Sequence, residues 1–161
     1  MKKILIFGNS GSGKSTLAKR LSCKYNLAHL DLDTLAWLLS NPPKRKPIED
    51  SSKEINQFIE LNKNWVIEGC YTDLLITLIP HCSEIIYMDL SVDKCISNAK
   101  ARPWEPHKYT SMDEQNQNLN MLIQWISDYP NRSDTFSKDA HIDLFDKFKG
   151  KKSKIETNST D

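Results

Sequence analysis

The sequence lacks several features that would place a protein in a special class. None of the apolar stretches in its 161 residues approaches the length of a membrane-spanning helix. The N-terminal apolar run, Ile4 to Phe7, is also too short for the core of a signal peptide. A net charge of +1 gives no overall attraction to nucleic acid or to an anionic membrane. We therefore expect no membrane partner and no strong binding of nucleic acid.

Cysteine is scarce, and its positions are not arranged for metal binding. Cys23, Cys70, Cys82 and Cys95 form no C-x-x-C pair, and none has a histidine at zinc-finger spacing. A chain of this length suits one domain with a sizeable core. We expect a single domain over residues 1–157 and a polar tail over residues 158–161.

The most informative stretch is GNSGSGKST, which matches the Walker A spacing G-x-x-x-x-G-K-[ST] of a phosphate-binding loop, or P-loop. Glycines in such a loop allow the backbone to approach a phosphate closely, and successive N–H groups then form a concave anion site. Lys14 would reach the β- and γ-phosphates, and the Ser15 hydroxyl would ligate Mg²⁺. The predicted nucleotide-binding residues are Gly8, Asn9, Ser10, Gly11, Ser12, Gly13, Lys14, Ser15 and Thr16.

The residues on both sides of the motif support this interpretation over a chance glycine- and serine-rich turn. The run Ile4 to Phe7 is typical of a buried parallel strand, and Leu17, Leu21 and Tyr25 follow at helical spacing. A helix that begins at the loop adds the positive end of its dipole to the phosphate site. With this motif and no export signal, we expect a cytoplasmic protein that uses ATP and Mg²⁺.

The rest of the chain alternates between short apolar runs and helical patterns. We expect strands at 26–31, 65–67, 84–89 and 154–157, helices at 51–62, 92–102, 119–126 and 138–148, a helix that begins within 32–39, and a loop at 40–50. This alternation predicts an α/β fold with a parallel sheet. Ligands of such sheets lie beyond the carboxyl ends of the strands, so the residues that follow each strand are candidate site residues.

Carboxylates follow two of the predicted strands. Asp31 and Asp33 form D-L-D after one strand and project to the same face of an extended chain, and Glu68 ends WVIE. We predict that Asp31 or Glu68 serves the metal through its water shell and that Asp33 orients an acceptor. Asp33 could instead cap a helix, and Glu68 could be a solvated strand end.

Three arginines could contact a phosphate or an acceptor. Arg102 opens the predicted lid, Arg102 to Ser111, where a positive charge would assist phosphoryl transfer, although it could also face the dipole of the preceding helix. Arg45 has the planar fork that suits an anion, and Arg132 could act from a later segment. The complete prediction is Lys14, Asp33 and Arg102 for catalysis, Ser15, Asp31 and Glu68 for the metal, and Asp33, Arg45, Glu68, Gly69 and Arg132 for the substrate.

Taken in order, these stretches resemble the small P-loop kinases related to adenylate, shikimate and gluconate kinases. The nearest branch is the adenylate-kinase-related one often labelled topology modulation protein. The resemblance covers Lys2 to Phe148 and is carried by GNSGSGKST, HLDLDTLAW, WVIEGCY and IIYMDLS. It implies a three-layer P-loop NTPase sandwich with a five-stranded parallel sheet in the order 2-3-1-4-5 and a short lid. Asp31 and Asp33 match the D-x-D of shikimate and gluconate kinases. The resemblance therefore implies that these two residues serve the Mg²⁺ water and the acceptor hydroxyl.

The sequence also departs from this group. Nucleotide-monophosphate kinases use several arginines on the acceptor phosphate, whereas residues 31–81 contain only Arg45 and the lid contains only Arg102. The glycine triplet that shikimate kinases carry after the third strand is EGC in this chain. We expect an ATP-dependent phosphotransferase, monomeric or homodimeric, that acts on a small-molecule acceptor, either a hydroxyl compound or a nucleotide. The alternative is a P-loop ATPase with a regulatory or nucleic-acid-associated role.

Overall fold

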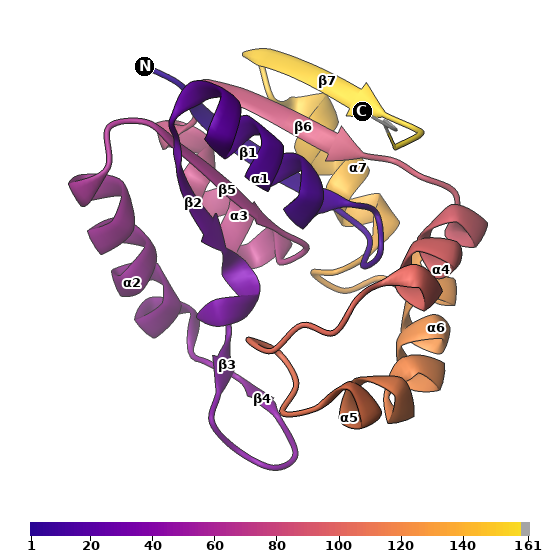
Figure 1. Cartoon of the computed structure of the whole chain (residues 1–161). Helices are drawn as coiled ribbons and strands as arrows, with labels where there is room; N and C mark the ends of the chain where they lie inside the picture. Colours follow the sequence, from indigo (N-terminus) through magenta and orange to yellow (C-terminus); the bar gives the residue numbers. More distant parts are fainter. Residues whose placement is uncertain (159–161) are drawn as a thin grey trace.

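The computed structural model describes residues 1–158 and has a central sheet of five parallel strands (Figure 1). The strands are β1 (Lys3–Gly8), β2 (Ala28–Asp31), β5 (Trp65–Gly69), β6 (Glu84–Met88) and β7 (Lys151–Ile155). Their order across the sheet is β2-β5-β1-β6-β7. Counted along the chain within this sheet, that order is 2-3-1-4-5, so the predicted P-loop NTPase fold is confirmed.

Helices cover both faces of the sheet and make it the middle layer of three (Figure 1). Side chains alternate along β1, so that Leu5 and Phe7 pack on one face and Ile4 and Ile6 on the other. The first face is covered by α2 (Ile48–Leu61), α3 (Thr72–Leu78) and α7 (Lys138–Lys147), and the second by α1 (Lys14–Tyr25), α4 (Val92–Ala101) and α6 (Leu119–Ser127). The short helix α5 (Met112–Gln117) precedes α6, and single turns lie at η1 (Leu32–Thr34), η2 (Ile79–His81) and η3 (Tyr129–Asn131).

The prediction of a helix within residues 32–39 is wrong. One turn, η1, is followed by a small hairpin in which β3 (Trp37–Leu38) pairs antiparallel with β4 (Lys44–Arg45). The Asp31 carboxylate accepts a hydrogen bond from the Asp33 N–H at 2.9 Å and caps this single turn. Pairing of β3 with β4 then satisfies backbone groups that a helix would have used. The predicted loop at 40–50 therefore contains β4 and the start of α2.

The last strand, β7, begins earlier than predicted, at Lys151 instead of 154. Its sequence, KKSKI, has exposed lysines at the edge of the sheet, so the apolar pattern that marks the other strands is missing. Pairing with β6 defines it, from Glu84 opposite Lys151 to Met88 opposite Ile155. Of the predicted tail, residues 159–161 lie outside the described residues.

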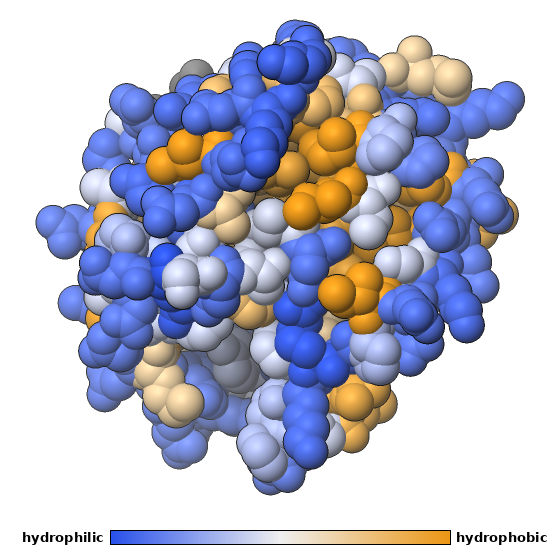
Figure 2. Space-filling model, turned by 180° about the vertical axis from the view of Figure 1, so that it is seen from behind, coloured by the Kyte–Doolittle hydropathy of each residue, from blue (hydrophilic) through white to orange (hydrophobic). Residues whose placement is uncertain are grey.

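The surface is mostly polar. On the face seen from behind in Figure 2, apolar side chains form separate patches between hydrophilic ones. No helix within residues 1–158 is long and apolar enough to cross a membrane. The apolar side chains that drive folding are thus gathered in the two cores on either side of the sheet.

Candidate active site

The phosphate-binding loop connects β1 to α1 and packs tightly on α4. Gly11 and Gly13 have φ values of +75° and +91°, which L side chains rarely adopt. A Cβ atom on Gly11 would lie 2.4 Å from the carbonyl oxygen of Cys95 in α4. A side chain at this position would therefore force the loop away from the helix that supports it.

Asparagine side chains hold the loop from outside. The Asn9 amide donates to the Ile126 carbonyl at 3.2 Å, and the Asn98 amide donates to the Gly11 carbonyl at 2.8 Å. Asn98 also donates to the Asn158 side chain at 2.8 Å, and Asn158 donates to the Ser12 carbonyl at 3.0 Å. These contacts fix the backbone by packing and hydrogen bonds with α4, α6 and the segment after β7. The bonds of Asn98 and Asn158 were not predicted, because no motif marks either residue and the tail was expected to be frayed.

The first turn of α1 brings the predicted metal ligands together. The Lys14 ammonium folds back over the loop and donates to the Asn9 carbonyl at 2.7 Å. The Ser15 hydroxyl donates to both oxygens of the Glu68 carboxylate, at 2.9 and 3.0 Å. Asp31 is the register partner of Glu68 on the neighbouring strand, so the two carboxylates end adjacent strands at the same edge.

Burial strongly changes the pKa of Glu68. It raises the pKa of the Glu68 carboxyl to about 8, Asp31 adds to the rise, and Lys14 opposes it. The hydroxyl and carboxylate oxygens are donors that suit Mg²⁺, which keeps several waters and shares its shell with phosphate oxygens. No group of three or more His, Cys, Asp or Glu residues among residues 1–158 is placed to hold a metal by itself. The Ser15 hydroxyl and the carboxyl groups of Glu68 and Asp31 are the oxygen groups that the strand ends offer to such an ion.

Asp33 has a partner for each of its carboxylate oxygens. The Tyr71 hydroxyl donates to Oδ1, and the Lys108 ammonium lies 2.9 Å from Oδ2. The Trp37 indole in turn donates to the Tyr71 hydroxyl at 2.9 Å. Burial alone would raise the pKa of Asp33, but Lys108, Tyr71 and Lys14 together hold it below the usual value. Asp33 is thus an anion at neutral pH, oriented by Tyr71 at one oxygen and paired with Lys108 at the other.

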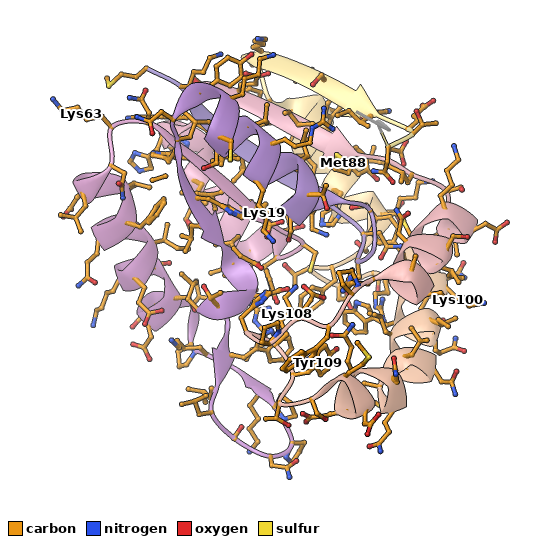
Figure 3. All side chains as sticks on the ribbon, viewed as in Figure 1. Lys19, Lys63, Met88, Lys100, Lys108 and Tyr109 are labelled. Carbon is orange, nitrogen blue, oxygen red and sulfur yellow. The ribbon has the colours of Figure 1, made fainter. Side chains whose placement is uncertain are left out.

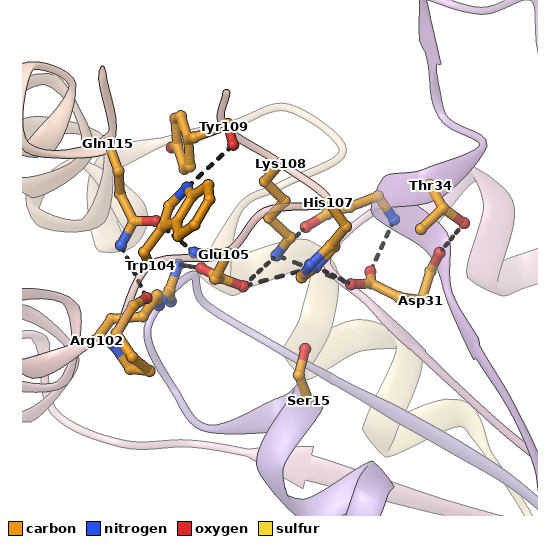
Figure 4. A network of polar contacts seen from close by, with 12 residues as sticks. Ser15, Asp31, Thr34, Arg102, Trp104, Glu105, His107, Lys108, Tyr109 and Gln115 are labelled. Carbon is orange, nitrogen blue, oxygen red and sulfur yellow. Dashed lines mark hydrogen bonds and ion pairs between the residues drawn. The ribbon is translucent and has the colours of Figure 1, made fainter. Parts of the chain in front are cut away.

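The segment from Arg102 to Ser111 leaves α4 and reaches back to the ends of the strands (Figure 4). Its Lys108 ammonium lies 2.9 Å from Asp33, 3.4 Å from Glu105 and 3.8 Å from Asp31. Burial alone would lower the pKa of Lys108, but Asp33 and Asp31 together raise it above its usual value. Lys108 is thus the residue that ties the lid to the sheet. No role was assigned to Lys108 from the sequence, because Asp31 and Asp33 lie far from it in the chain.

Arg102, the predicted lid arginine, lines the same cavity but already has an acidic partner. Its Nη1 lies 3.1 Å from the Glu105 carboxylate. The lid is also bonded to itself, since the Trp104 indole donates to the Tyr109 carbonyl at 3.1 Å (Figure 4). Arg102 could therefore reach a phosphate by leaving Glu105 or through the guanidinium N–H groups that Glu105 does not use.

The loop, the carboxylates and the lid share one cavity of about 790 Å³. It is lined by Lys14, Ser15, Asp31, Asp33, Glu68, Gly69, Arg102, Glu105 and Lys108, among others, and by Thr157 and Asn158 after the last strand. In Figure 3, Lys108 and Tyr109 lie on the chain that crosses from the strand ends to α5. A space of this size is in the range of small-molecule sites.

Two predicted substrate residues are not among the described residues that line this cavity. The Arg45 guanidinium lies 3.0 Å from Asp73 and 4.8 Å from the centre of the Tyr71 ring. Arg132 donates to the Trp125 carbonyl at 2.7 Å and lies 3.4 Å from the centre of the Trp125 ring. Both arginines have local partners that hold them in place, and their contact with the substrate stays a prediction.

Known proteins resemble this chain in sequence and in structure. The family model described as an AAA domain (AAA_18) matches residues 4–121, which include the loop, the strand-end carboxylates and the lid. The uncharacterized protein YqaC of Bacillus subtilis (strain 168) is 24% identical over 132 residues, which make up 81% of this chain and 74% of that protein. A solved structure of deoxyadenosine kinase from M. mycoides with bound dATP covers 97% of this chain and 91% of its own, with 14% identity and a TM-score of 0.46.

Proposed function

Because the chain belongs to the AAA domain family, we propose that it is a P-loop phosphotransferase that moves the γ-phosphoryl group of ATP to a small-molecule acceptor. One observation carries this proposal. The phosphate-binding loop and the carboxylates Asp31, Asp33 and Glu68 line a single cavity beneath a lid. A loop alone would serve any nucleotide-binding protein, but Asp33 adds an anionic group where an acceptor hydroxyl could be held.

At the nucleotide end, the backbone and Lys14 supply most of the binding. Lys14 would exchange the Asn9 carbonyl for the β- and γ-phosphate oxygens, since a charged phosphate is the stronger acceptor. Catalysis of phosphoryl transfer consists largely of positioning and charge stabilisation, which a loop of fixed shape can provide.

Ser15 and Glu68 would hold Mg²⁺, with Asp31 in its water shell. The ion would supply positive charge that offsets the charge of the phosphates. Glu68 must lose its proton to act as an acceptor for the metal or its waters, so metal binding would release a proton near neutral pH.

At the acceptor end, Asp33 would take the acceptor hydroxyl at Oδ2 while Tyr71 keeps Oδ1 in place. Lys108 occupies that position in the structure, so the acceptor would displace its ammonium from Asp33. Lys108 and Arg102 would then be free to face the transferred phosphoryl group. The lid would thus exchange carboxylate partners for phosphate partners during each turnover.

In this proposal, residues 1–157 act as one kinase domain with residues 102–111 as its lid. The preference for ATP over other nucleotides stays a prediction, as do the branch of P-loop kinases, the oligomeric state and the cytoplasmic location.

Acceptor-dependent ADP release tests the proposal. The protein is incubated with Mg·ATP and each member of a panel of nucleosides, nucleotides, sugars and hydroxy acids, and the phosphorylated product is identified by mass spectrometry. We expect at least one acceptor to raise ADP release well above hydrolysis by water, and Lys14→Ala to abolish the increase. Hydrolysis that no acceptor stimulates would instead favour the ATPase alternative.

A further inference from the structure

Carboxylates dominate the acceptor side of the cavity. From this we infer that the acceptor is an uncharged alcohol, of the sugar or nucleoside class, and that phosphorylated or carboxylated acceptors are excluded. The inference rests on the proposed function and names the substrate class of the same site.

The charges on this side are already matched before any ligand enters. The Lys108 ammonium lies within 4.0 Å of three carboxylates, Asp31, Asp33 and Glu105 (Figure 4). Glu105 also binds Arg102 at 3.1 Å. Among the described residues of the lid, Arg102 and Lys108 each have an acidic partner. His107, which is charged only if protonated, lies near Asp31 and Glu105.

The other cations of the cavity do not change this balance. Lys14 belongs to the phosphate loop and would be engaged by the nucleotide. Lys19 and Arg20 are exposed on α1 and form no ion pair with the acceptor-side carboxylates in the described part of the chain. Exposed charges such as these are screened by solvent and salt, so they attract a bound anion only weakly.

An anionic acceptor would meet repulsion in this place. Phosphate recognition uses arginine forks and backbone N–H groups, whereas Arg102 and Lys108, which line the same cavity, are paired with Asp31, Asp33 and Glu105. Like charges brought together in a partly desolvated site strongly oppose binding. A hydroxyl group, in contrast, can donate to any of these oxygens without adding charge.

The same arrangement favours release of the product. The acceptor oxygen forms a bond to the γ-phosphorus, the bond from that phosphorus to the β–γ bridging oxygen breaks, and ADP leaves with the bond's electron pair. The hydroxyl proton passes to Asp33 and then to solvent. The product is a phosphate monoester beside Asp31, Asp33 and Glu105, which repel it once Lys108 and Arg102 return to these carboxylates, so re-formation of the ion pairs favours its release.

Nucleotides with longer phosphate chains test this inference without knowledge of the acceptor. Adenosine 5′-pentaphosphate extends beyond the γ-phosphate into the acceptor side, and its affinity is compared with that of ATP by calorimetry at equal Mg²⁺ and ionic strength. We expect the pentaphosphate to bind no more than about threefold tighter than ATP. Binding that is tighter than for ATP by more than about threefold would overturn the inference, because it would show that this side of the cavity binds phosphate.

Charge-neutral variants identify the groups responsible. Glu105→Gln and Asp33→Asn keep the side-chain shape and should each raise the affinity for the pentaphosphate relative to ATP by about tenfold. Asp113→Asn is the matched control, since Asp113 is an exposed acid of α5 outside the cavity lining, and its ratio should equal that of the parent. Equal ratios in all three variants would overturn the inference, because the carboxylates would then not set the charge preference. Failure of ATP itself to bind would overturn the proposed function as well, whereas a preference for the pentaphosphate would overturn this inference alone.

Discussion

The two ends of the cavity are built in different ways. The phosphate end is backbone from one continuous stretch, residues 8–16, held by the hydrogen bond of its own Asn9 to α6 and by that of Asn98 from α4. The acceptor end is made of side chains from β2, β5 and the lid, which meet only in the folded protein (Figure 4). A backbone site has one shape, whereas ion-paired side chains can exchange partners. The comparison teaches that the phosphate-binding loop is preformed in this protein and that, in the proposed function, acceptor binding requires charges to rearrange.

The largest effect is expected from a variant that impairs the phosphate end of the cavity. Lys14→Ala removes the ammonium that would follow the β- and γ-phosphates, so we expect Mg·ATP to bind about 10- to 100-fold more weakly. Turnover should fall by about 10³-fold or more, since charge on the transferred group is lost as well. Calorimetry and ADP release measure the two quantities. Lys24→Ala, at the far end of the same helix, is the control and should behave as the parent. Unchanged ATP affinity in Lys14→Ala would remove the assignment of this site.

A second variant impairs the acceptor end of the cavity and leaves the phosphate end unchanged. Asp33→Asn keeps the shape but cannot accept the hydroxyl proton, so acceptor-dependent transfer should fall by about 10²-fold or more. ATP affinity should change little, because Asp33 hydrogen-bonds with Tyr71 and Lys108 and not with the loop. Asp93→Asn, an exposed acid in the first turn of α4, serves as the control. The comparison between the two ends fails if Asp33→Asn weakens ATP binding as much as Lys14→Ala does.

The two ends also differ in how far the sequence could predict them. The loop was predicted residue by residue, because its geometry depends on glycine spacing and on the adjoining strand and helix. Asp31, Asp33 and Glu68 were found from their position after strands, and all three line the cavity. Lys108 and Tyr71 were not assigned, because their contacts with Asp33 join segments far apart in the chain. Glu105 was not assigned either, because no motif marks its ion pairs with Arg102 and Lys108 within the lid.

Arg45 and Arg132 lie outside the described lining of the cavity because other groups hold them. Arg45 is held by Asp73, 28 positions away, and Arg132 by the carbonyl of Trp125, and neither partner can be recognised in one sequence. The fold itself was easier, because the central strands are nearly continuous apolar runs. Its two errors, the hairpin after Asp31 and the start of β7, fall where strand pairing rather than apolar pattern decides the structure.

Glu68 lies where the two ends meet, and its pKa provides a pH test. In the folded protein that pKa is raised from 4.5 to about 8. The folded state therefore keeps a proton that the unfolded chain has lost, and the free energy of unfolding falls as pH rises from about 4.5 to 8. Glu68→Gln has no such proton, so it should exceed the parent in stability by about 1 kcal/mol or more at pH 8, and by much less at pH 5.

Metal dependence in the same variant gives a second measurement. Binding of Mg²⁺ favours the ionised Glu68, so the Mg²⁺ concentration needed by the parent should fall between pH 6.5 and 8.5. Glu68→Gln should need about tenfold more Mg²⁺ and show no such dependence. Thermal unfolding and Mg²⁺ titration of ADP release supply the data, with the exposed Glu60→Gln as control. Identical pH curves in parent and Glu68→Gln would mean that Glu68 does not meet the metal.

The smallest expected effect concerns the contact between the lid and the strand ends. Lys108→Gln removes the ion pairs to Asp33, Glu105 and Asp31 but leaves the internal hydrogen bond from Trp104 to Tyr109. A partly exposed ion pair contributes at most about 1 kcal/mol, so local opening of the lid should become about fivefold more frequent.

Amide hydrogen exchange in the ligand-free protein measures this opening. Exchange across residues 102–111 should accelerate in Lys108→Gln, and exchange in β1 and β6 should stay the same, because those strands exchange through global unfolding. Lys100→Gln is the matched control, since Lys100 lies just before the lid and is exposed at the end of α4, away from Lys108 (Figure 3). Equal acceleration in both variants would show that general loss of charge loosens this region. No acceleration in Lys108→Gln would show that the lid is held by its own internal bonds, and the exchange of carboxylate for phosphate partners would then not control its opening.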